Sequence, residues 1–345
     1  MKRRKRVLLV CDTIGNTPRD YDVQTLLKTP DWQTERDCYT ALKRLGYTTD
    51  VIAVYDDIMP LIAKVKTFRP DIIFNQVEHF RGISTYERNL VALYELLGIA
   101  YTGSNPTGMI LCKNKAVTKE VLFARGMCVP RFVVVKKNET VKKNTSILYP
   151  AIVKPLRDES SYGISRSSIV THAAELKDRL AYIHERLDQD AIVEEYIAGD
   201  ELYVSVLGNE RLRVFPVRQL FFGTQKKRPT IATYKIKWDA AYRKKWNISY
   251  GFAHLPVRLT REIAATVKDA YKALRIDGYA RFDIRLDRDK RIYIIEANPN
   301  PCLARNEEFS LSAKKAGIPY EKVIDLIINA GHASYRKIHS FSIDS

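Results

Sequence analysis

Residues 281–301 of this 345-residue chain read RFDIRLDRDKRIYIIEANPNP. Two runs, 281–286 and 291–298, alternate between polar and apolar residues and flank the polar group DRDK at 287–290. Alternation with period 2 on both sides of a short polar turn is typical of a β-hairpin. The sequence therefore predicts a hairpin over 281–298, and this hairpin decides the interpretation of the rest of the chain.

The predicted pairing gathers polar side chains on one face of the hairpin. A loop of four residues sets Arg281 opposite Glu296 and Asp283 opposite Ile294, with Asp283 diagonal to Glu296. Because side chains alternate by two, Arg281, Asp283, Glu296 and Asn298 project the same way. Two carboxylates about 5 Å apart repel by roughly 3 kcal/mol at an effective dielectric of about 20. Either a hard cation such as Mg²⁺ or the guanidinium of Arg281 explains their proximity, and spacing alone leaves both explanations open.

The same residues resemble the C-terminal signature of the ATP-grasp ligases. Arg281-Phe-Asp283, followed by Glu296-Ala-Asn298-Pro-Asn-Pro, is similar to the pattern of the D-alanine–D-alanine ligase group and its relatives. The resemblance implies that Asp283, Glu296 and Asn298 hold two Mg²⁺ ions, for which Mn²⁺ is an alternative. It also implies that Arg281 steadies the tetrahedral intermediate.

Composition restricts the class of protein. A hydrophobic content of 46% with 28% charged residues is typical of a soluble globular protein of two or three domains. No apolar run is long enough for a transmembrane helix, and the run at 7–10 is too short for a signal peptide. Five cysteines without a CxxC pair predict reduced thiols, a cytoplasmic location and no zinc site.

A net charge of +17 favours anionic partners, which include a nucleotide, an acidic substrate or a nucleic acid. The basic residues are dispersed in short clusters, and no helix-turn-helix, zinc finger or RNA-recognition signature surrounds them. Nucleic-acid binding is therefore disfavoured, and the clusters are read as solvated surface.

Strands and helices alternate through the first hundred residues, which predicts a parallel sheet in an α/β domain. Ligands of such sheets bind at the carboxyl ends of the strands, so the loop after the third strand is expected to contact substrate. Its candidate residues are Glu78, His79, Arg81 and Arg88, although for each one alone an ordinary loop or helix-start role is the simpler explanation. The predicted strands are 6–12, 47–54 and 70–75, and the predicted helices are 34–45, 58–68 and 86–97.

The resemblance covers residues 70–330 strongly and residues 1–69 weakly. It implies an ATP-grasp fold preceded by an N-terminal parallel-sheet domain. The expected divisions are an N-terminal α/β domain at 1–111, a central ATP-grasp subdomain at 112–206, a C-terminal subdomain with lid and metal site at 207–330, and a loosely held tail at 331–345.

Two lysines are expected to touch the phosphates of ATP. The turn YTGS at 101–104 and the segment NKAVTK at 114–119 continue the resemblance, which assigns this contact to Lys115. Lys154 ends the apolar strand 151–154, where a compact point charge can reach a phosphate. By the resemblance, Lys154 binds the α- and β-phosphates.

The segment 191–197, which reads AIVEEYI, is expected to hold the adenosine. By the resemblance, Glu194 and the backbone around Glu195 and Ile197 read adenine, and Glu201 takes the ribose hydroxyls. A half-exposed antiparallel strand explains the same pattern without a ligand.

Two loops are expected to close over the phosphates. Residues 157–163 match the mobile loop of the family, in which Ser160 would help to place the first substrate. Residues 223–250 are long, basic and irregular, which is typical of a lid. The resemblance implies that Lys237 in this lid contacts the γ-phosphate, and Lys235 is the adjacent candidate.

The resemblance implies an ATP-dependent carboxylate–amine ligase that acts through an acyl phosphate and releases ADP and phosphate. Its partners would be small-molecule carboxylate and amine substrates, and a homodimer is common in the family. The alternative from another class is a non-catalytic ATP-binding module. The complete set of Asp, Glu and Asn ligands disfavours that alternative, because binding alone does not need all three.

Two departures from the D-alanine ligases concern the substrate. Cys302 stands where those enzymes have a glycine that helps to build the oxyanion hole, and it is expected to be a bystander, not a nucleophile. Glu307, followed by Glu308, stands where they have the serine that receives the second substrate's carboxylate. Acidic residues there would repel the carboxylate of D-alanine. An amine-bearing acceptor or a different pose is therefore expected.

Overall fold

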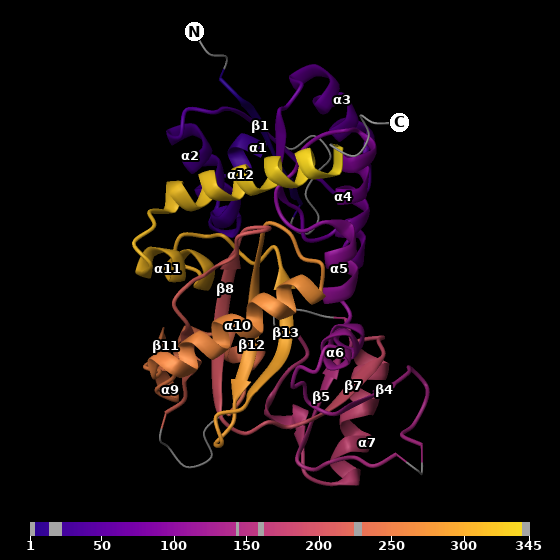
Figure 1. Ribbon diagram of the computed structural model, residues 1–345. Helices are drawn as coiled ribbons and strands as arrows, with labels where there is room; N and C mark the ends of the chain where they lie inside the picture. Colours follow the sequence, from indigo (N-terminus) through magenta and orange to yellow (C-terminus); the bar gives the residue numbers. More distant parts are fainter. Residues whose placement is uncertain (1–3, 14–22, 143–144, 158–161, 224–229, 340–345) are drawn as a thin grey trace.

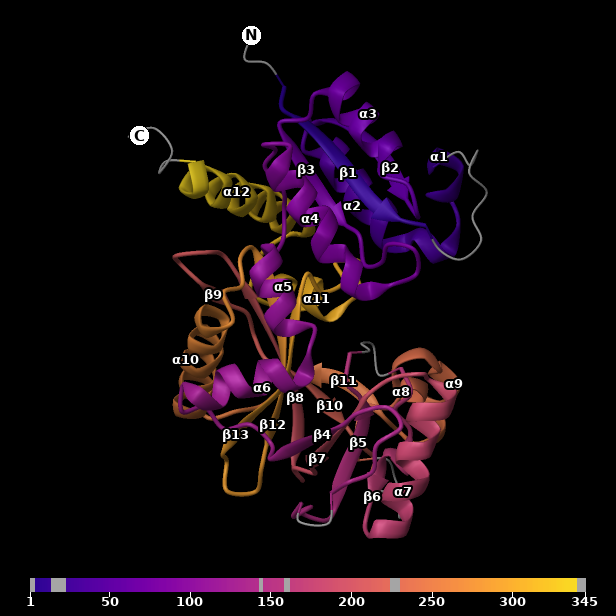
Figure 2. The ribbon, with the colours of Figure 1, turned by 90° about the vertical axis from the view of Figure 1, so that its right-hand side faces the viewer.

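Three β-sheets organise the chain in the computed structural model, each with helices on at least one face (Figure 1 and Figure 2). The predicted α/β fold class is confirmed. None of the helices in the described part of the chain is long and apolar enough to cross a membrane. The structure describes all residues except 1–3, 14–22, 143–144, 158–161, 224–229 and 340–345.

The N-terminal sheet is parallel, with the strand order β2-β1-β3. Its central strand is apolar throughout because helices cover both faces: Leu8 and Val10 lie in one hydrophobic cluster, and Val7 and Leu9 lie in another. The observed bounds lie within two residues of the predicted ones. The elements are β1 (Arg6–Asp12), α1 (Val23–Leu26), α2 (Gln33–Arg44), β2 (Thr48–Val54), α3 (Met59–Phe68), β3 (Ile72–Gln76) and α4 (Glu87–Leu96).

The last helix, α12 (Tyr320–His339), returns to this N-terminal sheet (Figure 1). Ile324 and Ile327 join the cluster that contains Val7 and Leu9. A Cβ at Gly331 would lie 2.3 Å from the carbonyl oxygen of Tyr101, so glycine permits close packing there. The loosely held tail predicted from residue 331 is therefore wrong as far as residue 339, since Gly331 is a packing position inside the helix and does not end it.

The central sheet is antiparallel, with the order β4-β7-β5-β6. Leu176 and Leu180 of its helix pack on Val153 and Val193 of the sheet. A π-helical turn at Tyr182–Arg186 continues α7. The elements are β4 (Phe132–Val135), β5 (Ala151–Pro155), β6 (Ile169–Val170), α7 (Ala173–Ala181) and β7 (Ala191–Glu195).

The third sheet has the order β11-β10-β8-β12-β13, and short β9 pairs with β8. β8 ends beside the expected boundary at residue 206, yet it pairs with β10 and β12 and so belongs to this sheet. The strands are β8 (Asp200–Leu207), β9 (Arg213–Val214), β10 (Arg218–Phe221), β11 (Ser249–Phe252), β12 (Tyr279–Leu286) and β13 (Ile292–Pro299). The remaining helices are α5 (Pro106–Cys112), α6 (Lys115–Ala124), α8 (Tyr234–Trp238), α9 (Ala240–Lys245), α10 (Val257–Ala273) and α11 (Glu308–Lys315).

The predicted hairpin is present as β12 and β13, but its register differs from the expected one. Asp283 pairs with Glu296, not with Ile294, and Arg281 pairs with Asn298. Ile294 pairs with Ile284, so Ile295 is the extra residue of a β-bulge. Leu286 pairs with Ile292, so the turn has five residues, one more than expected, and the bulge adds a second residue to the shift. The alternating pattern reveals neither change. The shift brings the two carboxylates directly opposite each other.

Candidate active site

The two faces of the third sheet differ sharply in chemistry. Leu202 and Val204 of β8, with Phe282 and Ile284 of β12, pack against α10 and form an apolar core. Alternation places the intervening residues on the opposite, open face. These residues are Glu201, Tyr203 and Ser205 of β8 and Arg281, Asp283 and Arg285 of β12.

Strand pairing aligns four of the open-face residues in one line across the sheet. Arg218 of β10 lies opposite Tyr203 of β8, Tyr203 lies opposite Asp283, and Asp283 lies opposite Glu296. Directly opposed residues of an antiparallel sheet share a face. We call Arg218, Tyr203, Asp283 and Glu296 the polar row.

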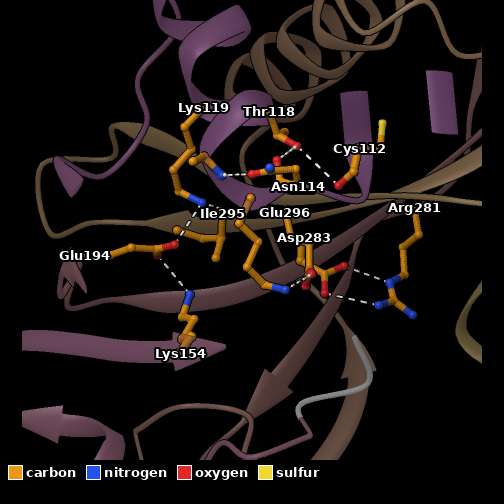
Figure 3. Close-up of polar contacts among 12 residues, drawn as sticks. Cys112, Asn114, Thr118, Lys119, Lys154, Glu194, Arg281, Asp283, Ile295 and Glu296 are labelled. Atoms are coloured by element: carbon orange, nitrogen blue, oxygen red, sulfur yellow. Dashed lines mark hydrogen bonds and ion pairs between the residues drawn. The ribbon is translucent and has the colours of Figure 1, made fainter. Parts of the chain in front are cut away.

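Cations surround the two carboxylates of the polar row (Figure 3). Arg281 donates to Asp283 from Nε at 2.7 Å and from Nη2 at 3.1 Å. The ammonium of Lys115 lies 3.3 Å from Oε1 of Glu296. Burial raises the pKa of Asp283 despite Arg281. Burial also opposes ionisation of Glu296, but the charges of Lys115, Lys237 and other cations outweigh it and lower that pKa to about 2.

The donor set fits a hard cation. Asn298 lies opposite Arg281, and its buried Nδ2 has no hydrogen-bond partner among the described residues. Because its amide can also present its oxygen, Asn298 can supply a third oxygen beside Asp283 and Glu296. Within the described ranges, no group of three or more His, Cys, Asp or Glu side chains could hold a metal. A metal site here therefore depends on the asparagine.

One side of the polar row opens into a cavity of about 80 Å³ between the central and third sheets. Glu201 is fixed there by the guanidinium of Arg285 and by the backbone N–H of Ala232, 3.2 Å away. The structure brings together in this lining the predicted nucleotide residues Lys154, Glu194, Glu195, Ile197, Glu201 and Lys237, with Asp283 and Glu296.

Glu194 is engaged by two lysines. Its carboxylate lies 2.9 Å from the ammonium of Lys119 and 2.9 Å from that of Lys154 (Figure 3). Lys119 is fully buried and also donates to the carbonyl oxygen of Ile295 at 2.9 Å. It thereby ties α6 to the bulge of β13. Sequence reasoning missed Lys119, although its spacing of four from Lys115 places both on one helix face.

Replacing Lys119 with Met is expected to destabilise the fold by about 3 kcal/mol, because the variant leaves one oxygen of buried Glu194 without its charge partner. Urea unfolding measures the change. Lys177→Met, at an exposed lysine of α7, is the control and should change the free energy of unfolding by less than about 0.5 kcal/mol. Equal stability of the two variants would contradict the tie between α6 and β13.

The other side of the polar row opens into a larger cavity of about 310 Å³. Of the predicted substrate residues, the structure brings Glu78 and Glu307 to its lining, together with Arg281 and Glu308. The structure does not bring His79, Arg81 or Arg88 there. His79 contacts Asp12, with 3.2 Å between Nδ1 and Oδ2, and Arg81 donates to the carbonyl oxygen of Asp56 at 3.4 Å.

The structure distinguishes the two lid lysines. Lys237 lines both cavities, whereas Lys235 lies over the ring of Tyr242, 5.9 Å from its centroid. The lid is not irregular as predicted, because the side chains of Thr233 and Asp239 cap two short helices, α8 and α9. Ser160 lies outside the described residues.

Cys302 lines the larger cavity at the end of β13. Its Sγ lies 3.3 Å from Oγ1 of Thr34. Burial raises the pKa of the thiol to about 11, so it is protonated near neutral pH. A protonated thiol is a poor nucleophile, which agrees with a bystander role.

Fold and site together define an ATP-grasp protein: the central and third sheets enclose a cavity that is lined by Lys154 and Lys237 and ends at the paired carboxylates of Asp283 and Glu296. Residues 121–329 match the model of the family described as D-ala D-ala ligase C-terminus. The D-alanine–D-alanine ligase of Thermotoga maritima is 30% identical over 298 residues, which are 84% of this chain and 88% of that protein. An uncharacterized protein of Sinorhizobium fredii, y4sG, is 28% identical over 268 residues, which are 76% of this chain and 75% of that protein.

A solved structure supports the fold. The D-alanine–D-alanine ligase from Bacillus anthracis, complexed with ATP, matches with a TM-score of 0.76 at 22% identity, over 97% of this chain and 99% of that chain. This chain belongs to the D-alanine–D-alanine ligase family of the ATP-grasp superfamily. It is an ATP-dependent ligase that forms a C–N bond.

Proposed function

We propose that this ligase binds ATP with Mg²⁺ across the polar row and joins a carboxylate to an amine other than that of D-alanine. The observation that carries the proposal is the position of Asp283 and Glu296, opposite each other between the two cavities. The smaller cavity would hold the adenosine, with Glu201 at the ribose. The larger cavity would hold the substrates.

In the first step, an oxygen of the substrate carboxylate bonds to the γ-phosphorus, and the bond from that phosphorus to ADP breaks. Lys115, Lys154 and Lys237 all act on Glu296, so their positive charge is concentrated where phosphate charge develops. Asp283, Glu296 and Asn298 would hold Mg²⁺, which when bound neutralises phosphate charge. Arg281 lines the substrate cavity beside them.

In the second step, the amine nitrogen bonds to the acyl carbon, phosphate leaves, and the nitrogen loses a proton. Arg281 would donate to the oxyanion of the tetrahedral intermediate. Glu307 lines the same cavity and would accept the proton, since partial desolvation and the charge of Glu308 raise its pKa to about 7. Glu308 lies 3.8 Å from Arg281, and Glu307 lines the same cavity.

The acidic wall formed by Glu307 and Glu308 supports an acceptor that presents its amine to this end of the cavity. A carboxylate placed beside these two glutamates would be repelled. The acceptor is therefore expected to differ from the D-alanine for which the relatives are named. A coupled phosphate-release assay across amino acids, dipeptides, amines and carboxylic acids tests the proposal. We expect ATP-dependent release with an acceptor other than D-alanine. D-alanine as the best substrate would contradict it.

Glu307 is expected to make the stability of the protein depend on pH. A carboxyl whose pKa is about 7 when folded and about 4.3 when unfolded binds its proton more tightly in the folded state. The stability of the wild type should therefore fall between pH 5 and pH 8, and Glu307→Gln should remove part of that fall. The difference should be below about 1 kcal/mol, because the side chain is partly solvated.

Thermal unfolding at both pH values measures this difference. Glu139→Gln, at an exposed glutamate in the loop after β4, is the control and should follow the wild type. If Glu307→Gln and the wild type show the same pH dependence, Glu307 ionises as a solvated carboxyl and the general-base role is unsupported.

We also propose a cytoplasmic location, which the supply of ATP and the five free cysteines support. The division into an N-terminal domain, a central subdomain and a C-terminal subdomain is retained as a proposal. In it, β8 is assigned to the C-terminal subdomain because of its strand pairing. The homodimer stays a prediction.

A further inference from the structure

Arg218 occupies the end of the polar row that the proposed chemistry does not use. It lies on β10, opposite Phe252 of β11 and Tyr203 of β8, and Tyr203 lies opposite Asp283. Two strand spacings, roughly 10 Å, therefore separate the backbones of Arg218 and Asp283. The side chain lines the larger cavity together with Glu307.

Arg218 is buried, and its side chain makes no hydrogen bond or ion pair with any residue that the structure describes. It is 7% exposed, and its Nε makes no hydrogen bond to any described residue. Its guanidinium carbon lies 5.3 Å from the ring centroid of Phe252, a cation–π contact that uses none of its N–H donors. No carboxylate of the described residues lies within ion-pair distance of it, and its charge reaches Glu307 only across the cavity, where it opposes the rise in the pKa of that carboxyl.

The other arginines of this region are paired. Arg281 contacts Asp283 through two hydrogen bonds, and Arg285 contacts Glu201. Arg243 donates to two backbone carbonyl oxygens of the lid, at 2.8 and 2.9 Å. The missing partner is therefore particular to Arg218 among these four.

Burying a charged group without hydrogen bonds is costly, so the missing partner is expected to be supplied by a ligand. A guanidinium presents parallel N–H donors that match the two oxygens of a carboxylate. We propose that Arg218 binds a substrate carboxylate that is not consumed in the ligation. This inference rests on the proposed function for the location of the substrates, since the consumed carboxylate would lie near Arg281.

Either of the two substrates of the ligation could carry the retained carboxylate. It belongs either to a dicarboxylic donor, whose second carboxylate is phosphorylated, or to an amino-acid acceptor, whose amine attacks the acyl phosphate. Either source gives a product with a free carboxylate. In both cases the substrate extends along the polar row, away from Asp283.

A binding experiment tests the inference without a known substrate. Malonate, succinate and glutarate are titrated into the wild type, Arg218→Gln and Arg213→Gln, with binding followed by calorimetry. Arg213 is an exposed arginine on β9 and is the matched control for lost charge. We expect at least one dicarboxylate to bind the wild type and Arg213→Gln equally and Arg218→Gln about ten- to hundredfold more weakly. Equal binding by all three proteins, or no binding of any probe, would overturn the inference.

Thermal unfolding without ligand shows whether Arg218 is needed for the stability of the fold or only for binding a carboxylate. Arg218→Gln should unfold at the same temperature as the wild type or higher, because it removes a buried, unpaired charge. A large fall in the unfolding temperature would mean that the fold needs the guanidinium, and would overturn the inference.

The turnover assay identifies the source of the carboxylate and separates this inference from the proposed function. Amino acids are compared with their primary amides as acceptors, and dicarboxylic acids with their monoamides as donors. If the substrate carries the retained carboxylate, Arg218→Gln should lower kcat/KM for the free acid. It should not lower kcat/KM for the amide, in which that carboxylate is blocked. If turnover occurs and no pair shows this effect, the inference fails and the proposed function stands. If no ATP turnover occurs but dicarboxylate binding still requires Arg218, the proposed function fails and the inference stands.

Discussion

Arg281→Ala is expected to reduce ATP-dependent phosphate release by about 10²–10³-fold, the usual cost of removing one preorganised oxyanion donor. Arg281 lines the substrate cavity but not the nucleotide cavity. ATP should therefore still bind with an affinity close to that of the wild type. Steady-state phosphate release and calorimetry with ATP measure the two quantities.

The matched control is Arg291→Ala, at an exposed arginine in the turn of the same hairpin, which should retain wild-type turnover. Near-normal turnover in Arg281→Ala would count against an oxyanion role. Loss of ATP affinity in parallel with turnover would instead mean that Arg281 serves to hold Asp283, to which it donates twice.

The double variant Asp283→Asn, Glu296→Gln is expected to lose Mg²⁺-dependent turnover by at least about 10³-fold, equivalent to about 4 kcal/mol of transition-state stabilisation. The physical reason is that both carboxylates disappear from the polar row, while the cations around them remain. The same phosphate-release assay, run over a range of Mg²⁺ concentrations, measures the loss.

The double variant must be shown to fold, because Arg281 and Lys115 lose the carboxylates with which they pair. Thermal unfolding and circular dichroism should show a folded protein. Asn298→Ala provides an independent test, since its amide carries no charge and takes no part in these ion pairs. ATP-dependent phosphate release at the wild-type rate in the folded double variant would exclude this metal site.

The sequence predicts much of the fold because its patterns are local. Alternation at 281–298 identifies the hairpin, and apolar runs such as 6–12 identify buried parallel strands. The register of the hairpin could not be predicted in the same way. The turn is one residue longer than its four polar residues suggest, and a bulge at Ile295 adds one more residue. Both leave the alternation on each side intact and shift only the pairing.

The parts of the site that the sequence did not reveal depend on contacts between distant segments. Lys113 and Glu87 form a buried ion pair, with 2.7 Å between Nζ and Oε1, in the lining of the larger cavity. Nothing local marks either residue, since a glutamate at the start of a helix or a lysine just after the end of one is usually solvated. Arg218 is missed for the same reason, because its burial and lack of a partner appear only when β8, β10 and β11 assemble.

Equilibrium dialysis of Mn²⁺ with the protein and a saturating non-hydrolysable ATP analogue, adenosine 5′-(β,γ-imido)triphosphate, tests the proposed metal site. It needs no knowledge of the substrates and reports whether the polar row holds the metal that accompanies the nucleotide. We expect about two Mn²⁺ to bind per chain of the wild type, and at least one fewer when Asp283 and Glu296 are replaced together. Equal Mn²⁺ binding by the two proteins would contradict the assignment of these carboxylates as metal ligands.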